Sequence, residues 1–480
     1  MKPYKILIFI ILAFASLGTL GWFFPQDGIK IGEITWHFPH PYTILVGEEH
    51  ENEMDIEANL QQLKSQTDVS QQQSVMDSLI FYKDYVNNNA ARLYFPDNNF
   101  RFYDHLFGIL ASSSKMSKVV HIVHYGDSQI EMDRISSTFR HRLQQTFGGS
   151  GAGMIPAIQT IPTFTISQSY GGALERYVIY GDVSQPRATH RRYGLMANVA
   201  EVYGSASVSM SSITSSRTFA NTKTFNRIVL LLGNNAANFS ATCAGQTQQI
   251  SAAKRGVTRM EWTFQQPLSR ATVSMNGTAE IYGISMESTS GVAVDNVPMR
   301  GCSGTIFTRI DSSNLSQCYS DMNVRLIIMQ YGGNMMPQIN SQTAIDNYMK
   351  SIARQIKYVK HCNPNAEILF IGPSDMSKRI NGKMQTYPYL PALNEALKKT
   401  VLDNGGAYWD MFHVMGGENS MVAWVKHNPA WAGGDYVHFT EAGAIEIANT
   451  LSDAFLVHYQ FYLLRKRCPQ ELLDRFMKMK

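Results

Sequence analysis

Apolar and polar positions follow three different patterns along the chain. Near residue 120 a short apolar run ends at Gly126, and Ile130, Ile135, Phe139 and Leu143 then recur at helical spacing among charged residues. A continuous apolar run followed by this period predicts a buried strand and then an amphipathic helix. The same alternation of strands and helices returns after residue 280, so the pattern is interrupted and later resumed.

The resumed pattern predicts an α/β domain. Alternating strands and helices are typical of a parallel sheet with helices on both faces, a three-layer α/β/α arrangement. We assign this domain to residues 97–156 and 280–460. The predicted elements of its second part are strands at 280–287, 324–333 and 366–375 and helices at 344–361 and 390–405.

Residues 157–279, between the two parts, have a different character. Charges are sparse there, serine, threonine and valine are common, and short apolar segments are separated by glycine, asparagine and proline. Such segments predict an all-β unit with the form of a sandwich. We therefore expect a sandwich-like β module inserted between the first helix and the second strand of the α/β domain.

The N-terminus indicates export. Lys2 and Lys5 precede nineteen uncharged residues at positions 6–24. That run is close to the ~20 residues that span a membrane, although residues 1–24 could also be a cleaved signal peptide. The lysines favour an anchor in the bacterial cytoplasmic membrane, with the remainder on its periplasmic side. Residues 25–96 are expected to form a spacer, and residues 461–480 a basic C-terminal tail.

Charge and cysteine content exclude several classes of function. The formal net charge is only +4 over 480 residues, so nucleic acid is not an expected partner. The five cysteines are scattered without a CxxC pair, which predicts neither a zinc site nor a dense disulfide framework. One bridge between Cys302 and Cys318 stays open, and free buried thiols are favoured. The oligomeric state is not indicated.

Three loops carry side chains suited to nucleophilic catalysis. Ser128 lies at the turn between the first strand and helix, where it could expose a nucleophile or cap the helix. Asn334 directly follows a buried strand, and Asp435 precedes His438 by three residues. Strand ends of a parallel sheet meet along one edge, so these loops should come together. There, His438 would accept the Ser128 proton while Asp435 orients the imidazole.

Two further pairs lie near the serine turn. His121 and His124 point to opposite faces of one strand, so no shared metal is expected, and His124 should pack under the site. Glu131 and Arg134 lie about one helical turn apart and predict a local ion pair.

These motifs resemble those of the SGNH hydrolase superfamily, also called the GDSL family. Its blocks are matched by GDSQ at 126–129, GGN ending at Asn334 and DYVH ending at His438. Gln129 stands where the eponymous motif has leucine. With the glycines at 148–153 and the inserted β unit, the chain resembles a bacterial envelope branch that includes peptidoglycan O-acetylesterases, in which a carbohydrate-binding-like module interrupts the hydrolase.

The resemblance implies roles for five residues. Ser128, Asp435 and His438 would be the catalytic residues, and the oxyanion hole would consist of the Ser128 N–H, a glycine N–H and the Asn334 side chain. We choose Gly301 because the oxyanion glycine should follow the second strand of the sheet, which is expected to end near residue 287. The glycines nearer the serine are expected to form a flexible junction into the β module.

The implied function is that of a serine esterase that removes O-acetyl groups from a cell-envelope polysaccharide, with peptidoglycan favoured. The reaction would pass through an acetyl-enzyme and would need no metal and no organic cofactor. The same residues would make an O-acetyltransferase if a sugar hydroxyl replaced water. A non-catalytic alternative is a membrane-tethered glycan-binding protein.

Overall fold

The computed structural model describes residues 16, 19, 22–25, 29–31, 34–36, 75–215 and 218–478. The chain divides into two compact units, Met1–Met76 and Asp77–Lys480. In the first unit, β1 (Ile29–Ile31) and β2 (Ile34–Trp36) form an antiparallel hairpin. The predicted membrane segment at 6–24 lies almost wholly outside the described residues. Within the described ranges, no helix combines the length and the apolar character needed to cross a bilayer.

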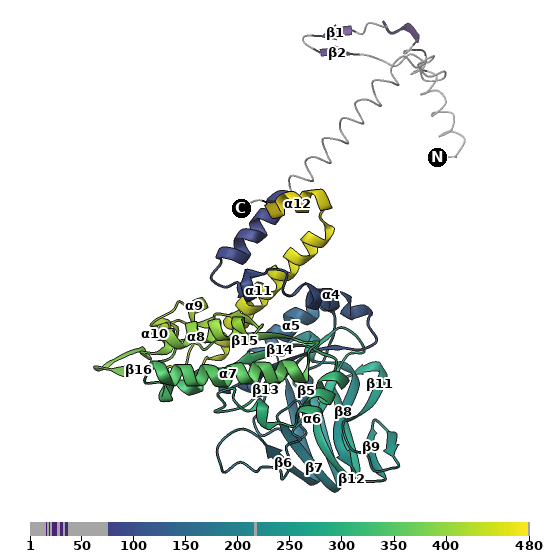
Figure 1. Ribbon diagram of the computed structural model, residues 1–480. Coiled ribbons are helices and arrows are strands. Elements are labelled where there is room, and N and C mark those ends of the chain that lie inside the picture. The colour runs from purple at the N-terminus through teal and green to yellow at the C-terminus, as the bar shows by residue number, and fades with distance from the viewer. Residues whose placement is uncertain are drawn as a thin grey trace. The chain divides into compact units, whose positions relative to one another are not determined.

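A six-stranded sheet forms the centre of the second unit (Figure 1), in the order β13-β4-β14-β15-β18-β3. Neighbouring strands are parallel except at β3, which is antiparallel at one edge. The strands are β3 (Leu93–Tyr94), β4 (Val120–Gly126), β13 (Val292–Pro298), β14 (Val324–Gln330), β15 (Glu367–Ile371) and β18 (Ala407–Trp409). Because β3 pairs with β18, the domain begins before the predicted boundary at residue 97.

Helices cover both faces of this sheet. One layer consists of α4 (Asp104–Ser112), α5 (Ser136–Phe147) and α11 (Glu441–Arg467), and the other of α6 (Ser312–Asp321), α7 (Gln342–Cys362) and α8 (Leu390–Asp403). Val120 and Ile122 of β4 pack into the first layer, whereas Val123 and Tyr125 pack into the second. This alternation follows from the two-residue period of a strand. The α/β/α layering matches the prediction.

Shorter elements complete this unit. Residues 75–88 are helical, within the predicted spacer, and residues 461–467 are the last turns of α11 rather than a tail. The remaining elements are η1 (Pro96–Asn98), η2 (Ser113–Lys115), η5 (Phe307–Arg309), β16 (Ser377–Ile380), β17 (Lys383–Thr386), α9 (Met411–Val414), α10 (Ser420–Lys426) and α12 (Gln470–Lys478).

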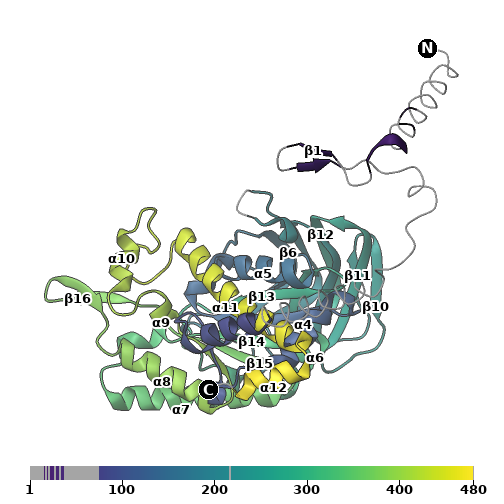
Figure 2. The same cartoon turned by 90° about the horizontal axis from the view of Figure 1, so that it is seen from above.

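An eight-stranded antiparallel sheet lies in sequence between α5 and β13. In Figures 1 and 2 it occupies the end of the unit opposite β16, α8 and α10. Its elements are β5 (Gly153–Ile155), β6 (Ile166–Val178), β7 (Asn198–Ser212), η4 (Ala220–Thr222), β8 (Phe225–Asn235), β9 (Phe239–Cys243), β10 (Gln246–Ile250), β11 (Thr258–Leu268) and β12 (Arg270–Glu287).

The long strand β12 holds this sheet together. Its first part pairs with β7 and β9, and its last part pairs with β8 and β5. The strands therefore form one hydrogen-bonded sheet around an apolar core, in place of the two separate sheets of the expected sandwich. The sheet also extends over 153–287, beyond the predicted limits of 157–279. The segment 280–287, predicted as the second strand of the parallel sheet, is the end of β12, and β13 takes that place.

The chain leaves and re-enters the parallel-sheet domain at one closely packed junction. The Val292 N–H donates to the Gly148 carbonyl at 3.0 Å. A Cβ at Gly149 would lie 2.3 Å from the Val292 oxygen, and one at Gly151 would lie 2.1 Å from the Met286 oxygen. Both glycines also have positive φ, +116° and +86°. Only glycine fits here, so the expected flexible junction is in fact tight.

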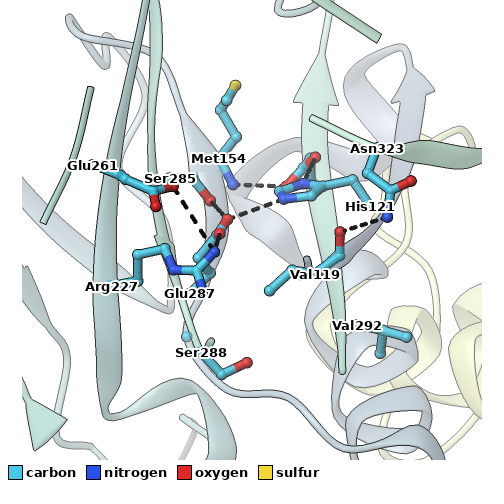
Figure 3. Close-up of polar contacts among 12 residues, drawn as sticks. Val119, His121, Met154, Arg227, Glu261, Ser285, Glu287, Ser288, Val292 and Asn323 are labelled. Carbon is cyan, nitrogen blue, oxygen red and sulfur yellow. Dashed lines mark hydrogen bonds and ion pairs between the residues drawn. The ribbon is translucent and has the colours of Figure 1, made fainter. Parts of the chain in front are cut away.

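A buried ionic cluster joins the two sheets (Figure 3). His121 of β4 lies 2.7 Å through Nδ1 from Asp295 Oδ2 in β13, and 3.0 Å through Nε2 from Glu287 Oε2 in β12. The three side chains are at most 2% exposed. Asp295 also accepts the Met154 N–H of β5 at 2.7 Å. Burial by itself lowers the pKa of His121, but the two carboxylates outweigh it and raise that pKa to about 10.

Candidate active site

A sharp turn at the end of β4 presents Ser128. Gly126 is the last residue of the strand, and a Cβ there would lie 2.9 Å from Ile130 Cδ1. Asp127 accepts the Gln129 N–H at 2.9 Å and so caps the short helix η3 (Ser128–Asp133). Asp127 therefore performs the capping that the sequence left open for this turn, and the Ser128 hydroxyl remains available for another partner.

That partner is His438. Ser128 Oγ lies 2.8 Å from His438 Nε2, and His438 Nδ1 lies 2.7 Å from Asp435 Oδ2. The Asp435 Oδ1 atom accepts the backbone N–H groups of Val437 and His438, at 3.0 and 3.1 Å. The hydroxyl, imidazole and carboxylate thus form a continuous hydrogen-bonded chain, although Ser128 and Asp435 are 307 positions apart in sequence. The structure brings these three predicted residues together.

The carboxylate in this chain is held in its charged form. Partial burial raises the pKa of Asp435. Hydrogen bonds from the His438 ring and from the backbone N–H groups of His438 and Val437 together outweigh this effect, so the pKa of Asp435 lies below its usual range. His438 and Asp435 are 37% and 51% exposed, so solvent reaches the site directly. A charged Asp435 keeps the proton on Nδ1 of His438 and leaves Nε2 free to accept the serine proton.

Asn334 lies beside the serine turn but its amide is already occupied. It follows β14 in the short helix η6 (Gly333–Gln338). Its Nδ2 donates to Asp127 Oδ2 at 3.0 Å and to the Cys302 carbonyl at 3.2 Å. Burial raises the pKa of Asp127 to about 6, against the opposing effects of the Gln129 N–H, the charge of His438 and the Asn334 amide. Asn334 must share or release one of these hydrogen bonds to stabilise an oxyanion.

Gly301 lies in the loop after β13, and both of its neighbours contact the site. Arg300 pairs with Glu131 of the serine turn at 2.6 Å, and the Cys302 carbonyl accepts the Asn334 amide. Gly301 has φ +73°, and no atom lies within 4 Å of the position that a Cβ would occupy. The strand predicted before this loop was wrong, and although the loop contacts the serine turn and Asn334, Gly301 does not line the pocket at Ser128, so its oxyanion role stays a prediction.

A pocket opens above these residues. Its volume is about 780 Å³ when the open solvent at its mouth is included, and Ser128, His438, Asn334 and Asp127 line it. Because Ser128 and Asn334 both line this space, a carbonyl group bound there can meet the serine nucleophile, and it can meet the Asn334 amide as a donor once that amide shares or releases one of its present hydrogen bonds.

Gln129, which replaces the motif leucine, fastens the histidine loop to the serine turn. Its Nε2 donates to the Val437 carbonyl at 2.6 Å, and its Oε1 accepts the Phe439 N–H at 3.3 Å. These two contacts lie on either side of His438 in sequence. Gln129 is buried. The sequence signal for this role was the replacement of the motif leucine by a side chain that can both donate and accept hydrogen bonds.

Arg134 and Glu131 do not form the expected local ion pair. Arg134 instead donates to three backbone carbonyls, those of Glu131 and Phe439 at 3.0 Å and that of Ser128 at 3.3 Å. The Glu131 carboxylate binds Arg300 through both oxygens, at 2.8 and 2.6 Å. The helical spacing failed as a guide because η3 is broken at Glu131, whose backbone is extended. Both arginines connect the serine turn to neighbouring loops.

The serine turn contains strained backbone that its surroundings hold in place. Met132 and Asp133 have φ values of +62° and +63°, which non-glycine residues rarely adopt. Arg140 binds both Asp133 oxygens, at 2.7 and 3.0 Å, and the Thr165 hydroxyl donates to Asp133 at 2.8 Å. The Phe164 N–H donates to the Met132 carbonyl. The segment before β6 therefore supports the turn that carries Ser128.

His124 lies beneath the site, as expected. Its Nε2 is 3.0 Å from Gln330 Oε1, and its Nδ1 is 2.9 Å from Ser136 Oγ. Burial lowers the pKa of His124 to about 4, so this imidazole is neutral and packs as a structural residue.

One group of side chains in the described part of the chain has the spacing of a metal site. Glu395, Asp410 and His413 offer ligand atoms within 4.8 Å of one another. Lys398 Nζ, however, lies 2.7 Å from Glu395 Oε1 and 3.3 Å from Asp410 Oδ2. The ammonium group already neutralises these carboxylates, which argues against a cation there. All five cysteines are free thiols, so the possible bridge between Cys302 and Cys318 is not formed.

Comparison with known proteins identifies the fold. No family model and no curated protein matches the sequence significantly. The structure is similar to that of a peptidoglycan O-acetylesterase, with a TM-score of 0.60, 20% sequence identity, and coverage of 76% of this chain and 96% of that chain. A family two carbohydrate esterase from Cellvibrio japonicus (TM-score 0.24, 11% identity, 62% and 99% coverage) and an acetyl xylan esterase (TM-score 0.26, 16% identity, 34% and 81% coverage) are more distant. The first similarity establishes a shared fold.

Proposed function

We propose that this protein is a serine esterase that removes O-acetyl groups from a cell-envelope polysaccharide, with peptidoglycan as the favoured substrate. The observation that carries the proposal is the hydrogen-bonded chain from Ser128 through His438 to Asp435, at a pocket that Asn334 also lines. The fold shared with a peptidoglycan O-acetylesterase supports it. The substrate implies action on the periplasmic side of the membrane, and a C-terminal reporter active only in the cytoplasm would overturn that placement.

The geometry supports a two-step reaction. The Ser128 oxygen attacks the acetyl carbonyl carbon while its proton passes to His438 Nε2, and Asp435 stabilises the resulting imidazolium. When the tetrahedral intermediate collapses, the bond to the sugar oxygen breaks and His438 returns the proton to that oxygen. Water then attacks the acetyl-enzyme, its proton passes to His438, and collapse releases acetate and restores the Ser128 hydroxyl.

Acetate release tests this function directly. Purified protein should liberate acetate from O-acetylated peptidoglycan faster than from acetylated neutral polysaccharides, and mass spectrometry should find a transient acetyl group on Ser128. A sugar acceptor that captures this acetyl group in preference to water would identify an O-acetyltransferase with the same residues. Absence of the acetyl-enzyme and of acetate release would exclude both reactions and favour the non-catalytic alternative.

Asn334→Ala should slow the proposed reaction by about 100- to 1,000-fold in kcat, because it removes one donor to the oxyanion. KM for a small acetate ester should change much less, since the ground-state carbonyl carries little charge. Asn347→Ala, at an exposed position on α7, is the matched control and should retain wild-type kinetics. Wild-type kcat in Asn334→Ala would remove Asn334 from the oxyanion hole.

Gln129→Leu should lower kcat by about 10- to 100-fold, because a displacement of His438 by roughly 1 Å weakens proton transfer. Gln129→Glu keeps an acceptor for the Phe439 N–H but loses the donor to the Val437 carbonyl, so it separates the two contacts. Steady-state kinetics should show the loss in kcat with KM nearly unchanged. If a lower melting temperature fully accounts for the loss of activity, Gln129 stabilises the protein and does not position His438.

A further inference from the structure

A second pocket lies between the serine turn and the antiparallel sheet. Its volume is about 690 Å³ when the open solvent at its mouth is included. One wall consists of Met132 and Asp133 from the serine turn and Pro298 from the end of β13, and the other comes from the segment 154–165 and from β6. Met132 is four residues after Ser128, and Pro298 is three residues before Gly301. The pocket therefore borders the serine turn and the end of β13 that leads to the Gly301 loop, although it shares no lining residue with the pocket at Ser128.

Most of the lining is apolar, but one cation in it lacks a counter-ion. Arg176 of β6 donates through Nη2 to the Tyr180 hydroxyl at 3.0 Å, and its Nε atom is buried without a hydrogen-bond partner. Among the described residues no carboxylate pairs with it. A buried N–H without an acceptor costs about 1–3 kcal/mol, more when the group is charged. Arg176 is therefore suited to an anion that enters the pocket.

Arg140 also lines this pocket, but unlike Arg176 it has a counter-ion. Its guanidinium binds both oxygens of Asp133 and donates through Nε to the Val294 carbonyl at 2.8 Å. Its charge is paired with Asp133, and each of its three nitrogens already donates within the protein, so it is less suited than Arg176 to bind an anionic ligand. The free positive charge of this pocket is that of Arg176.

An unused acceptor accompanies this donor. Gln159 also lines the pocket, and its Oε1 is buried without a partner, while its Nε2 donates to the Ile161 carbonyl at 2.8 Å. Burial raises the pKa of the Tyr180 hydroxyl, and among the charges that act on it is that of Glu131 in the serine turn. Tyr180 also lines the pocket, and its hydroxyl accepts the Arg176 hydrogen bond. Donor, acceptor and apolar walls together match a short peptide with small apolar side chains and a carboxylate.

We propose that this second pocket binds a carboxylate-bearing peptide arm of the glycan whose acetyl group lies at Ser128. The inference rests on the proposed esterase function and narrows its substrate to peptide-substituted glycans. The carboxylate binds the Arg176 guanidinium in a charge-assisted hydrogen bond, a peptide N–H donates to Gln159 Oε1, and apolar side chains contact Met132 and Pro298. Neutral acetylated polysaccharides have no group that would pair with Arg176, so they are poorer substrates.

The test compares one O-acetylated peptidoglycan before and after an amidase has removed its peptides. Wild-type protein should have a higher kcat/KM on the peptide-bearing polymer than on the peptide-free polymer. Arg176→Gln should bring the ratio of these two kcat/KM values close to one, and the change should come from a higher KM on the peptide-bearing polymer. Loss of one charge-assisted hydrogen bond corresponds to about a 10- to 100-fold change. Arg176→Lys should restore part of the ratio. Arg354→Gln, at an exposed position on α7, is the matched control and should keep the wild-type ratio.

Binding provides a second measurement that does not require turnover. Muramyl dipeptide should inhibit hydrolysis of the peptide-bearing polymer competitively, and the same compound with its carboxylate converted to an amide should inhibit about 10- to 100-fold more weakly. Equal wild-type rates on the two polymers, or equal inhibition by the two compounds, would overturn the proposal. A preference for longer acyl esters that is unaffected by Arg176→Gln would also overturn it, because the pocket would then hold an acyl chain.

The two levels of the proposal fail separately. If wild-type protein cleaves a small acetate ester and treats both polymers alike, the esterase function stands and the peptide pocket is wrong. If it releases acetate from no ester, the function itself is wrong.

Discussion

Ser128→Ala is expected to lower kcat for ester hydrolysis by about 10⁴- to 10⁶-fold. The substitution removes the only oxygen that lies within hydrogen-bonding distance of His438 Nε2 among the described residues. Without it, no acyl-enzyme forms, and the remaining groups can only bind the ester and stabilise its oxyanion. A continuous assay with a chromogenic acetate ester and a sensitive end-point assay for acetate cover this range of rates.

The companion substitutions define the three residues as one unit. His438→Ala should lose as much activity as Ser128→Ala, and the double variant should be little worse, since each change alone abolishes the same step. Asp435→Asn should lose less than either, because His438 is partly exposed and remains tied to the serine turn through its neighbours. Ser351→Ala on α7 is the matched control. Substantial acetate release by Ser128→Ala would contradict the mechanism.

His121→Gln is expected to lower the free energy of unfolding by about 3–5 kcal/mol, the range found when one partner of a buried ion pair is removed. The glutamine would leave the buried carboxylates of Asp295 and Glu287 facing each other without the cation between them. Urea denaturation at pH 7 would measure the loss. His361→Gln, at an exposed position on α7, is the control and should change the unfolding free energy very little.

The pH dependence of unfolding distinguishes loss of charge from loss of packing. The pKa of His121 is raised to about 10 in the folded protein, from 6.5 for a free imidazole. Its contribution to stability is therefore complete below about pH 6.5 and is lost as the pH rises toward 10. The pKa of Glu287 is lowered by the His121 charge and by hydrogen bonds from His121 and Ser285, against the effect of burial, so its contribution is lost in acid. Arg227 and Arg259 also face Glu287, each at 3.7 Å.

The wild-type protein should accordingly lose stability relative to His121→Gln as the pH rises from 6.5 to 10, so that the difference between the two shrinks. A difference that stays constant over this interval would show that His121 acts through packing alone. Because the cluster joins β4 to β12 and β13, its loss should also loosen the contact between the two sheets, which hydrogen exchange of the β5 and β13 amides would report.

Local sequence pattern was a good guide to the layers of the fold. The apolar periods predicted β4, β14, β15, α7 and α8, because a strand buried on both faces and a helix buried on one each leave a characteristic spacing. The pattern failed at 280–287, where an equally apolar strand pairs with the antiparallel sheet. A strand's period shows that it is buried, but not which strand is its partner.

The sequence predicted the main residues of the candidate site but not the contacts that hold them in place. Asp435 and His438 lie three residues apart, so their pairing is a local matter. Ser128 and Asn334 each directly follow a predicted strand, and His438 lies in the loop before the last helix. The contacts of Gln129 with residues 437 and 439 were not visible, since a single glutamine has no periodic signal. The partner of Glu131 was also missed, because helical spacing favoured Arg134 over the distant Arg300.

The sequence by itself determined the alternation of strands and helices, the position of the serine turn and the residues able to perform ester chemistry, because backbone hydrogen bonding and side-chain burial act over a few neighbouring residues. Only the tertiary structure decided which distant groups meet. His121 meets Glu287, Gln129 meets the histidine loop, and Arg176 pairs with no carboxylate in the part of the chain that the structure describes. Charge pairing and cavity formation depend on distances in space, and residues more than a hundred positions apart carry no record of those distances in their spacing.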